Sequence, residues 1–196
     1  MFFKTKSVYD WLIVGLGNPG SDYELTRHNA GFMSVDNLKE KENFDFSKSR
    51  MDSLIGEFKL NNKRILVIKP QTFMKLSGKA VKKIALFYKI PTDRIIVIHD
   101  DITLDVGKLR IRRKGSDGGQ KGMRNIITLL GTDNITRIKI GVGQKPNPNY
   151  DVVSWVLGKF PKDQIETLNS VLLSSVDAVK EIILNGIDSA MNKYSS

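Results

Sequence analysis

Short, continuous runs of apolar residues mark the strands that the sequence predicts. The run 11–16 (WLIVGL) contains the first glycine of the chain and is typical of a strand buried on both faces. The run 94–98 (RIIVI) is the clearest strand of the chain. Two further runs, 53–60 and 63–69, are separated by a pair of asparagines, and two turn residues between apolar runs indicate a β-hairpin.

The remaining pattern alternates strands with helices. Cations alternate with aliphatic residues over 108–112, which predicts a half-exposed strand, and 137–142 predicts another. Apolar positions at helical spacing predict helices over 29–41, over 77–88 with Ser77 as N-cap, over 123–130, and over 161–193.

This order of elements predicts an α/β fold. We expect a single domain over residues 1–196, with a mixed, mostly parallel twisted sheet flanked by helices. Residues 1–10 are expected to form a short N-terminal extension, and residues 161–193 a C-terminal helix. The length is close to that of a typical domain, and the sequence shows neither an internal repeat nor a low-complexity segment.

Composition excludes several classes of site and protein. The chain has no Cys, which rules out disulfides, thiol nucleophiles and thiolate zinc sites. Only His28 and His99 carry an imidazole, so we expect no metal and no other cofactor. No run approaches the roughly 20 apolar residues of a membrane span, and residues 1–10 lack the apolar core of a secretory signal. We therefore expect a cytoplasmic protein without membrane contact and, by default, a monomer.

The chain is strongly basic, and the charge is unevenly spread. The net charge is +10 overall, and it is +12 over the first 160 residues because residues 161–196 hold three Lys against five acidic residues. Such an excess on one body favours a polyanionic partner, nucleic acid first. A merely solubilising surface is the alternative that charge alone leaves open.

The glycine turn after the first strand resembles two nucleotide-binding motifs. Residues 15–20 (GLGNPG) satisfy G-x-G-x-x-G, but Pro19 removes an N–H donor and the next segment is polar, unlike a helix start. The Lys of a phosphate-binding loop is absent from the same residues. The chain also lacks the G-x-S-x-G turn of a serine hydrolase. These three readings are disfavoured.

Polar residues follow the two clearest strands. The first strand leads to Asn18 and then to Thr26-Arg27-His28-Asn29, and the strand at 94–98 leads to His99-Asp100-Asp101. Functional groups of open α/β sheets gather at such strand ends. A His beside an Asp is a general-base pair in outline, with water as the nucleophile. For His28 a local packing role stays open, and we interpret His99 as a core residue.

Four segments together identify a family resemblance. GLGNPGSDYELTRHNAGF, KPQTFMKLSGKAV, IIVIHDD and KGSDGGQKGMRNI resemble bacterial-type peptidyl-tRNA hydrolase over residues 11–160, and the likeness continues into the C-terminal helix. The resemblance implies a single α/β domain with a mixed sheet. It also implies hydrolysis of the ester that joins a peptide to the 3′ ribose of tRNA, which recycles tRNA from aborted translation.

The resemblance also assigns expected roles to individual residues. His28 falls on the catalytic base, Asp100 on the carboxylate that orients it, and Asn18 on the amide that binds the peptide. Tyr23 and Phe73 fall on positions that line the substrate cleft. The candidates for contact with the tRNA backbone are the basic residues Lys108, Arg110, Arg112, Arg113, Lys114 and Arg124, with a solvated strand face as the alternative.

Three positions depart from the family pattern. Lys75 and Lys121 stand where the family has Asn, and Gln120 stands where His is usual. Lys only donates hydrogen bonds, whereas Asn donates and accepts. Its charge opposes an imidazolium nearby, but it also favours an oxyanion or a phosphate. The expected function is therefore an active hydrolase with an altered peptide cleft. The alternatives are an impaired or non-catalytic RNA-binding relative and, more weakly, a nucleotide-binding protein that uses the glycine turn.

Overall fold

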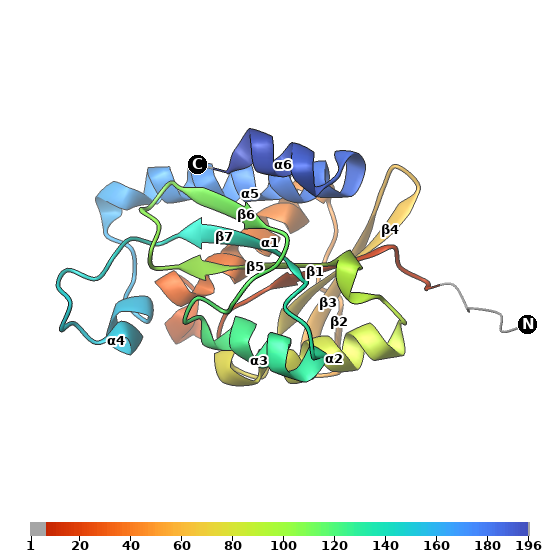
Figure 1. The fold of residues 1–196 in the computed structure, drawn as a ribbon, viewed down its shortest axis with the longest axis horizontal. Coiled ribbons are helices and arrows are strands. Elements are labelled where there is room, and N and C mark those ends of the chain that lie inside the picture. Colours follow the sequence, from red (N-terminus) through yellow and green to blue (C-terminus); the bar gives the residue numbers. More distant parts are fainter. Residues whose placement is uncertain (1–6, 196) are drawn as a thin grey trace, which may run out of the picture.

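Seven strands form one mixed sheet in the order β2-β3-β4-β1-β5-β7-β6 (Figure 1). The computed structural model describes residues 7–195. The strands are β1 (Trp11–Gly15), β2 (Lys48–Arg50), β3 (Ser53–Leu60), β4 (Lys63–Pro70), β5 (Ile95–Asp101), β6 (Leu109–Arg112) and β7 (Thr136–Gly141). The pairings among β4, β1, β5 and β7 are parallel, and the outer pairings β2–β3, β3–β4 and β6–β7 are antiparallel. The mixed α/β sheet is confirmed, with its parallel part confined to the four central strands.

Helices cover both faces of this sheet. They are α1 (Ala30–Glu42), α2 (Ser77–Phe87), α3 (Lys121–Leu130), α4 (Val152–Val156), α5 (Ile165–Asn185) and α6 (Ile187–Tyr194). Short 3₁₀ turns occur at η1 (Ser21–Tyr23), η2 (Arg27–Asn29), η3 (Met74–Leu76), η4 (Thr92–Arg94) and η5 (Lys162–Gln164). α1, α5 and α6 lie on one face and α2 and α3 on the other, while α4 lies beyond the end of the sheet toward which β5 and β7 point (Figure 1).

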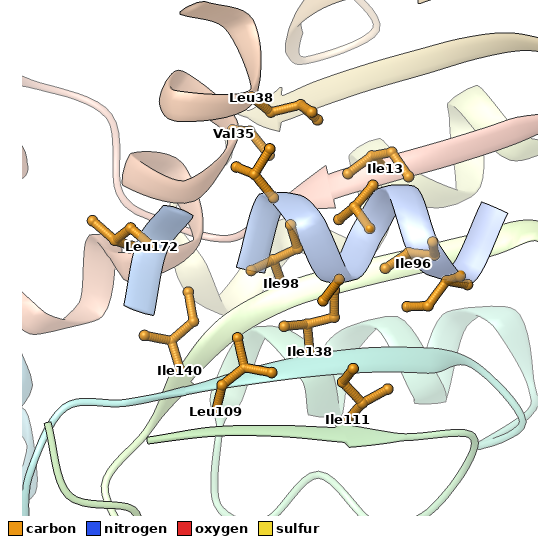
Figure 2. Packing of buried hydrophobic residues seen from close by; sticks show 14 of the residues in the cluster. Ile13, Val35, Leu38, Ile96, Ile98, Leu109, Ile111, Ile138, Ile140 and Leu172 are labelled. Atoms are coloured by element: carbon orange, nitrogen blue, oxygen red, sulfur yellow. The ribbon is translucent and has the colours of Figure 1, made fainter. Parts of the chain in front are cut away.

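The central strands are buried on both sides because alternate residues enter two separate cores. In β1, Ile13 packs toward α1 and α5, whereas Leu12 and Val14 pack toward α2 and α3. Figure 2 shows the first core, in which isoleucines of β1, β5 and β7 meet Val35 and Leu38 of α1. This two-sided burial explains why the strands are continuous apolar runs and not alternating ones.

Some expected boundaries are wrong. The predicted helix 161–193 is two helices, because Gly186, at a φ of 93°, separates α5 from α6. Ser77 is the first residue of α2 and not its N-cap, and its hydroxyl donates to the Met74 carbonyl. β2 and α4 were not predicted at all.

The predicted N-terminal extension falls partly outside the described residues, which begin at residue 7. The rest of it belongs to the fold. Tyr9 is buried, its ring packs edge-on against Tyr88, and the Ser7 hydroxyl donates to the Tyr88 carbonyl. Within residues 7–195, no helix has the length and apolar character that crossing a membrane requires.

Gly31, in the first turn of α1, is where that helix approaches the sheet most closely. A Cβ at Gly31 would lie 2.3 Å from the Ile98 carbonyl oxygen and 2.5 Å from the Leu16 amide nitrogen. Both contacts are with backbone, so neither neighbour can rotate away. The approach fixes the start of α1, and therefore η2 just before it, against the carboxyl ends of β1 and β5.

We predict that Gly31→Ala lowers the free energy of unfolding by about 3 kcal/mol, the upper range for overpacking a core. Denaturant unfolding of the variant measures this change. Glu40→Ala, on the exposed side of the same helix, is the control and should change stability by less than about 0.5 kcal/mol. Equal stability of Gly31→Ala and the wild type would contradict the close packing described here.

Candidate active site

His28, which is partly buried, and Asp100, which is buried, form a pair at the carboxyl end of the central strands. Asp100 is near the end of β5, and His28 is the middle residue of η2. The His28 Nδ1 lies 2.8 Å from Asp100 Oδ2, with side chains 12% and 3% exposed. The carboxylate accepts the Nδ1 proton, which leaves Nε2 with a free lone pair. The pair expected from the two strand ends is therefore in contact.

Gln120 completes the environment of Asp100. This buried side chain donates from Nε2 to Asp100 Oδ1 at 3.0 Å, and its Oε1 accepts from the Met123 amide at 2.7 Å. The second bond caps the N-terminus of α3, so the start of that helix is tied to the carboxylate. Both oxygens of Asp100 are thus held, one by His28 and the other by Gln120. The sequence shows Gln120 only as a departure from the family pattern and does not indicate its bond to Asp100.

Asn18 is fixed from two directions. Its Oδ1 accepts from the Met74 amide at 2.8 Å, so its NH₂ group is the part of the side chain left to donate. Asn29 holds the Asn18 backbone by accepting from its amide at 2.8 Å and donating to its carbonyl at 3.0 Å. The sequence presents Asn29 only as the neighbour of His28, and its bonding to Asn18 depends on the fold.

These polar groups lie at one side of a cavity of about 670 Å³. Asn18, His28, Asp100 and Gln120 line it together with Lys75 and Lys121. Its apolar lining includes Phe73, Leu76, Val152, Val153, Val156 and Leu157. Tyr23, which was also expected in the cleft, is not among the lining residues. It packs edge-on against the exposed ring of Phe73, with 6.1 Å between the ring centroids.

Arg27, the residue before His28, holds the far wall of the cavity, which α4 forms. Its guanidinium lies 3.7 Å from the centroid of the Trp155 ring in α4 and donates to the Lys159 carbonyl at 3.0 Å. Its backbone amide donates to the Gly158 carbonyl at 3.0 Å. The side chain is only 6% exposed, and this burial lowers the pKa of Arg27 from its usual value. The sequence gives no signal for this role of Arg27, because its partners are carbonyls and a ring and, among the described residues, it forms no salt bridge.

The comparisons with known proteins agree with this geometry. A family model described as "Peptidyl-tRNA hydrolase" matches residues 12–196. The chain belongs to the peptidyl-tRNA hydrolase family. A peptidyl-tRNA hydrolase of Clostridium botulinum (strain Eklund 17B / Type B) is 49% identical over 185 residues, which cover 94% of this chain and 95% of the relative. One of Thermoanaerobacter sp. (strain X514) is 46% identical over 94% of this chain and 99% of the relative.

Solved structures of the peptidyl-tRNA hydrolase family have the same fold. The crystal structure of peptidyl-tRNA hydrolase from Acinetobacter baumannii superposes with a TM-score of 0.89 at 31% identity, and covers 97% of this chain and 99% of that one. The resemblance that the four sequence segments indicated is therefore confirmed at the level of family and fold.

The basic residues expected to contact the tRNA backbone differ in whether they already form a salt bridge within the protein. Arg113 forms a salt bridge with Asp188 at 2.6 Å, and Arg124 forms one with Asp117 at 3.0 Å. Within the part of the chain that the structure describes, the remaining four form no salt bridge; they are Lys108, Arg110, Arg112 and Lys114. These four lie on or beside the edge strand β6, and within residues 7–195 no carboxylate neutralises their charge.

The loop before α3 is supported by a second buried arginine. Arg137 of β7 is 1% exposed and donates from Nη1 to the carbonyls of Gly115 and Ser116 and from Nη2 to that of Asp133. These bonds fix the loop that carries Gln120 toward Asp100.

The other histidine has a structural position. His99 is 1% exposed, its Nδ1 lies 2.7 Å from the Asp100 carbonyl, and burial lowers its pKa. The interpretation of His99 as a core residue is thus confirmed. Among residues 7–195, no group of three or more His, Asp or Glu side chains is arranged to hold a metal ion.

We predict that Arg27→Lys loosens α4 without disturbing α1. The lysine ammonium is not planar, so it cannot stack on Trp155 as the guanidinium does while also donating to the Lys159 carbonyl. Residue-resolved hydrogen exchange should show amides of residues 155–158 exchanging about tenfold faster, whereas those of α1 change little. Arg124→Lys, which alters an exposed salt bridge, is the matched control. Unchanged exchange in α4 would show that other contacts suffice to hold the wall.

Proposed function

We propose that the protein hydrolyses the ester bond between a peptide and the 3′ ribose of tRNA, with His28 as the general base and Asp100 orienting it. The observation that carries this proposal is the 2.8 Å contact between His28 and Asp100 at the edge of a cavity of about 670 Å³. Membership of the peptidyl-tRNA hydrolase family supports the reaction and the substrate.

The pair supplies the proton transfers that ester hydrolysis needs. Nε2 of His28 takes a proton from water as the water oxygen attacks the ester carbonyl. The tetrahedral intermediate then collapses, the bond to the ribose oxygen breaks, and the imidazolium returns the proton to that oxygen. Asp100 stabilises the imidazolium between the two transfers. Gln120 holds Asp100 in place through its other oxygen.

Asn18 and the apolar wall position the peptide in this proposal. The NH₂ group of Asn18 donates to a carbonyl oxygen of the substrate, because the amide oxygen is already bonded to Met74. Phe73 and α4 offer apolar surface to the peptide side chains. Arg27 fixes α4 relative to His28 and acts as a positioning residue.

The backbone of the tRNA contacts the basic edge of the sheet in this proposal. Lys108, Arg110, Arg112 and Lys114 form no salt bridge within residues 7–195 and lie on or beside β6, from which the chain continues into the loop that leads to Gln120. Arg113 and Arg124 contribute less, because each is already paired with an Asp. The monomeric state and the cytoplasmic location remain predictions, which sedimentation and cell fractionation test.

We predict that His28→Ala reduces turnover of an N-blocked aminoacyl-tRNA by at least about a hundredfold, the lower range for loss of a general base. Asp100→Asn should also reduce it strongly, because the amide does not fix the Nδ1 proton in the same way. Release of labelled peptide from the tRNA measures both. Lys82→Gln, an exposed change on α2, is the control.

Two results would contradict this role. If His28→Ala retained turnover, His28 would not be the general base. An inactive wild type that still binds tRNA in a salt-dependent way would favour the non-catalytic RNA-binding alternative.

We predict that Arg110→Gln and Arg112→Gln each reduce the slope of log affinity for tRNA against log salt concentration by about one, as expected for the loss of one phosphate contact. Salt titrations of tRNA binding measure the slope. Arg113→Gln removes a charge that Asp188 already neutralises and should change the slope less. Identical slopes in all variants would indicate a merely solvated strand face.

A further inference from the structure

The cavity has an unbalanced charge. Among the described residues that line it, Asp100 is the acidic one, and both of its oxygens are bonded, to His28 and Gln120. Lys75 and Lys121 also line the cavity, and both are exposed. Neither forms a salt bridge within residues 7–195. The catalytic mechanism above uses neither ammonium group.

The two lysines come from segments that are tied together. Lys75 is the middle residue of η3, and Lys121 is the first residue of α3. Met74, next to Lys75, accepts from Gln120 Nε2 at its sulfur at 3.1 Å and donates its amide to Asn18. The backbones that carry both cations are therefore fixed to each other and to the catalytic groups, while the flexible stems reach into the cavity.

The helix that begins at Lys121 makes this part of the cavity more attractive to an anion. Lys121 lies at the N-terminus of the ten-residue helix α3, where the helix dipole adds positive potential. Across the cavity, Asp151 caps α4, and its pKa is lowered by its bonds with Ser154 and, to a smaller extent, by the charge of Lys121. Asp151 offsets part of the positive charge of Lys121, but the two form no salt bridge within residues 7–195, so the ammonium group is still available to another anion.

We propose that Lys75 and Lys121 make the cavity select peptides that carry an acidic side chain next to the scissile ester. This inference rests on the proposed hydrolase function and specifies the class of peptide. The occupant is a carboxylate of the peptide and not a phosphate of the tRNA, because the lysines share the cavity with the apolar wall formed by Phe73 and α4. Lys108, Arg110, Arg112 and Lys114, which form no salt bridge in the part of the chain that the structure describes, are already available to phosphates.

The test compares two substrates that differ only in charge. N-acetyl-Ala-Glu and N-acetyl-Ala-Gln are attached to the same tRNA through the α-carboxyl group of their last residue, and kcat/KM is measured for each. The wild type should prefer the Glu substrate by about three- to tenfold, the range for one or two partly exposed ion pairs. The ratio should approach one in the double variant Lys75→Gln/Lys121→Gln and at high salt. Lys82→Gln, outside the cavity, should keep the wild-type ratio.

A binding measurement separates failure of this inference from failure of the proposed function. The dissociation constants of the same two tRNAs are measured in a His28→Ala background, where turnover does not interfere, and the Glu form should bind more tightly by a similar factor. Equal affinity and equal kcat/KM for the two substrates in the wild type would overturn the inference. If removal of the lysines weakened the binding of both substrates equally, the lysines would be binding the last phosphate of the tRNA, which precedes the terminal ribose, and this result would also overturn the inference.

Discussion

The active site depends on a buried carboxylate whose two oxygens must both be bonded. Asp100 is 3% exposed, and an ionised group so far from water is tolerated only with partners for its lone pairs. Those partners come from segments far apart in the chain: His28 from the turn before α1 and Gln120 from the start of α3. Satisfying Asp100 therefore also fixes the relative positions of the two segments that carry the base and one side of the cavity.

The same reasoning extends from the base to the opposite wall. Arg27, the neighbour of His28, holds α4 through Trp155 and two carbonyls, although α4 lies well over 100 residues further along the chain. Among residues 7–195 no carboxylate pairs with this buried cation, so the cost of burying it is offset by carbonyl and ring contacts. In this account, three consecutive residues of η2 serve three contacts: Arg27 fixes the wall, His28 faces Asp100, and Asn29 fixes Asn18.

The parts of this structure that the sequence predicts are those with a local signal. The central strands are continuous apolar runs because both faces are buried, and the hairpin has its two turn residues. His28 and Asp100 could be brought together because both follow strands that end at the same edge of a sheet. The break at Gly186 escaped prediction because the apolar spacing continues across it, and α4 escaped because five residues carry too little periodicity.

The contacts of Gln120, Asn29 and Arg27 left no trace in the sequence, because their partners are backbone groups or side chains that only the fold brings near. The motifs identify the right segments, but they do not show that Arg27 holds α4 or that Asn29 holds Asn18.

The tautomer of His28 most directly tests the claim that Asp100 orients His28 as the base, and ¹⁵N NMR of the neutral imidazole reports that tautomer. We predict a protonated Nδ1 and an unprotonated Nε2, and a loss of that preference in Asp100→Ala. A proton on Nε2 in the wild type would contradict the role of His28 as the base, because the nitrogen facing the substrate could not then accept a proton from water.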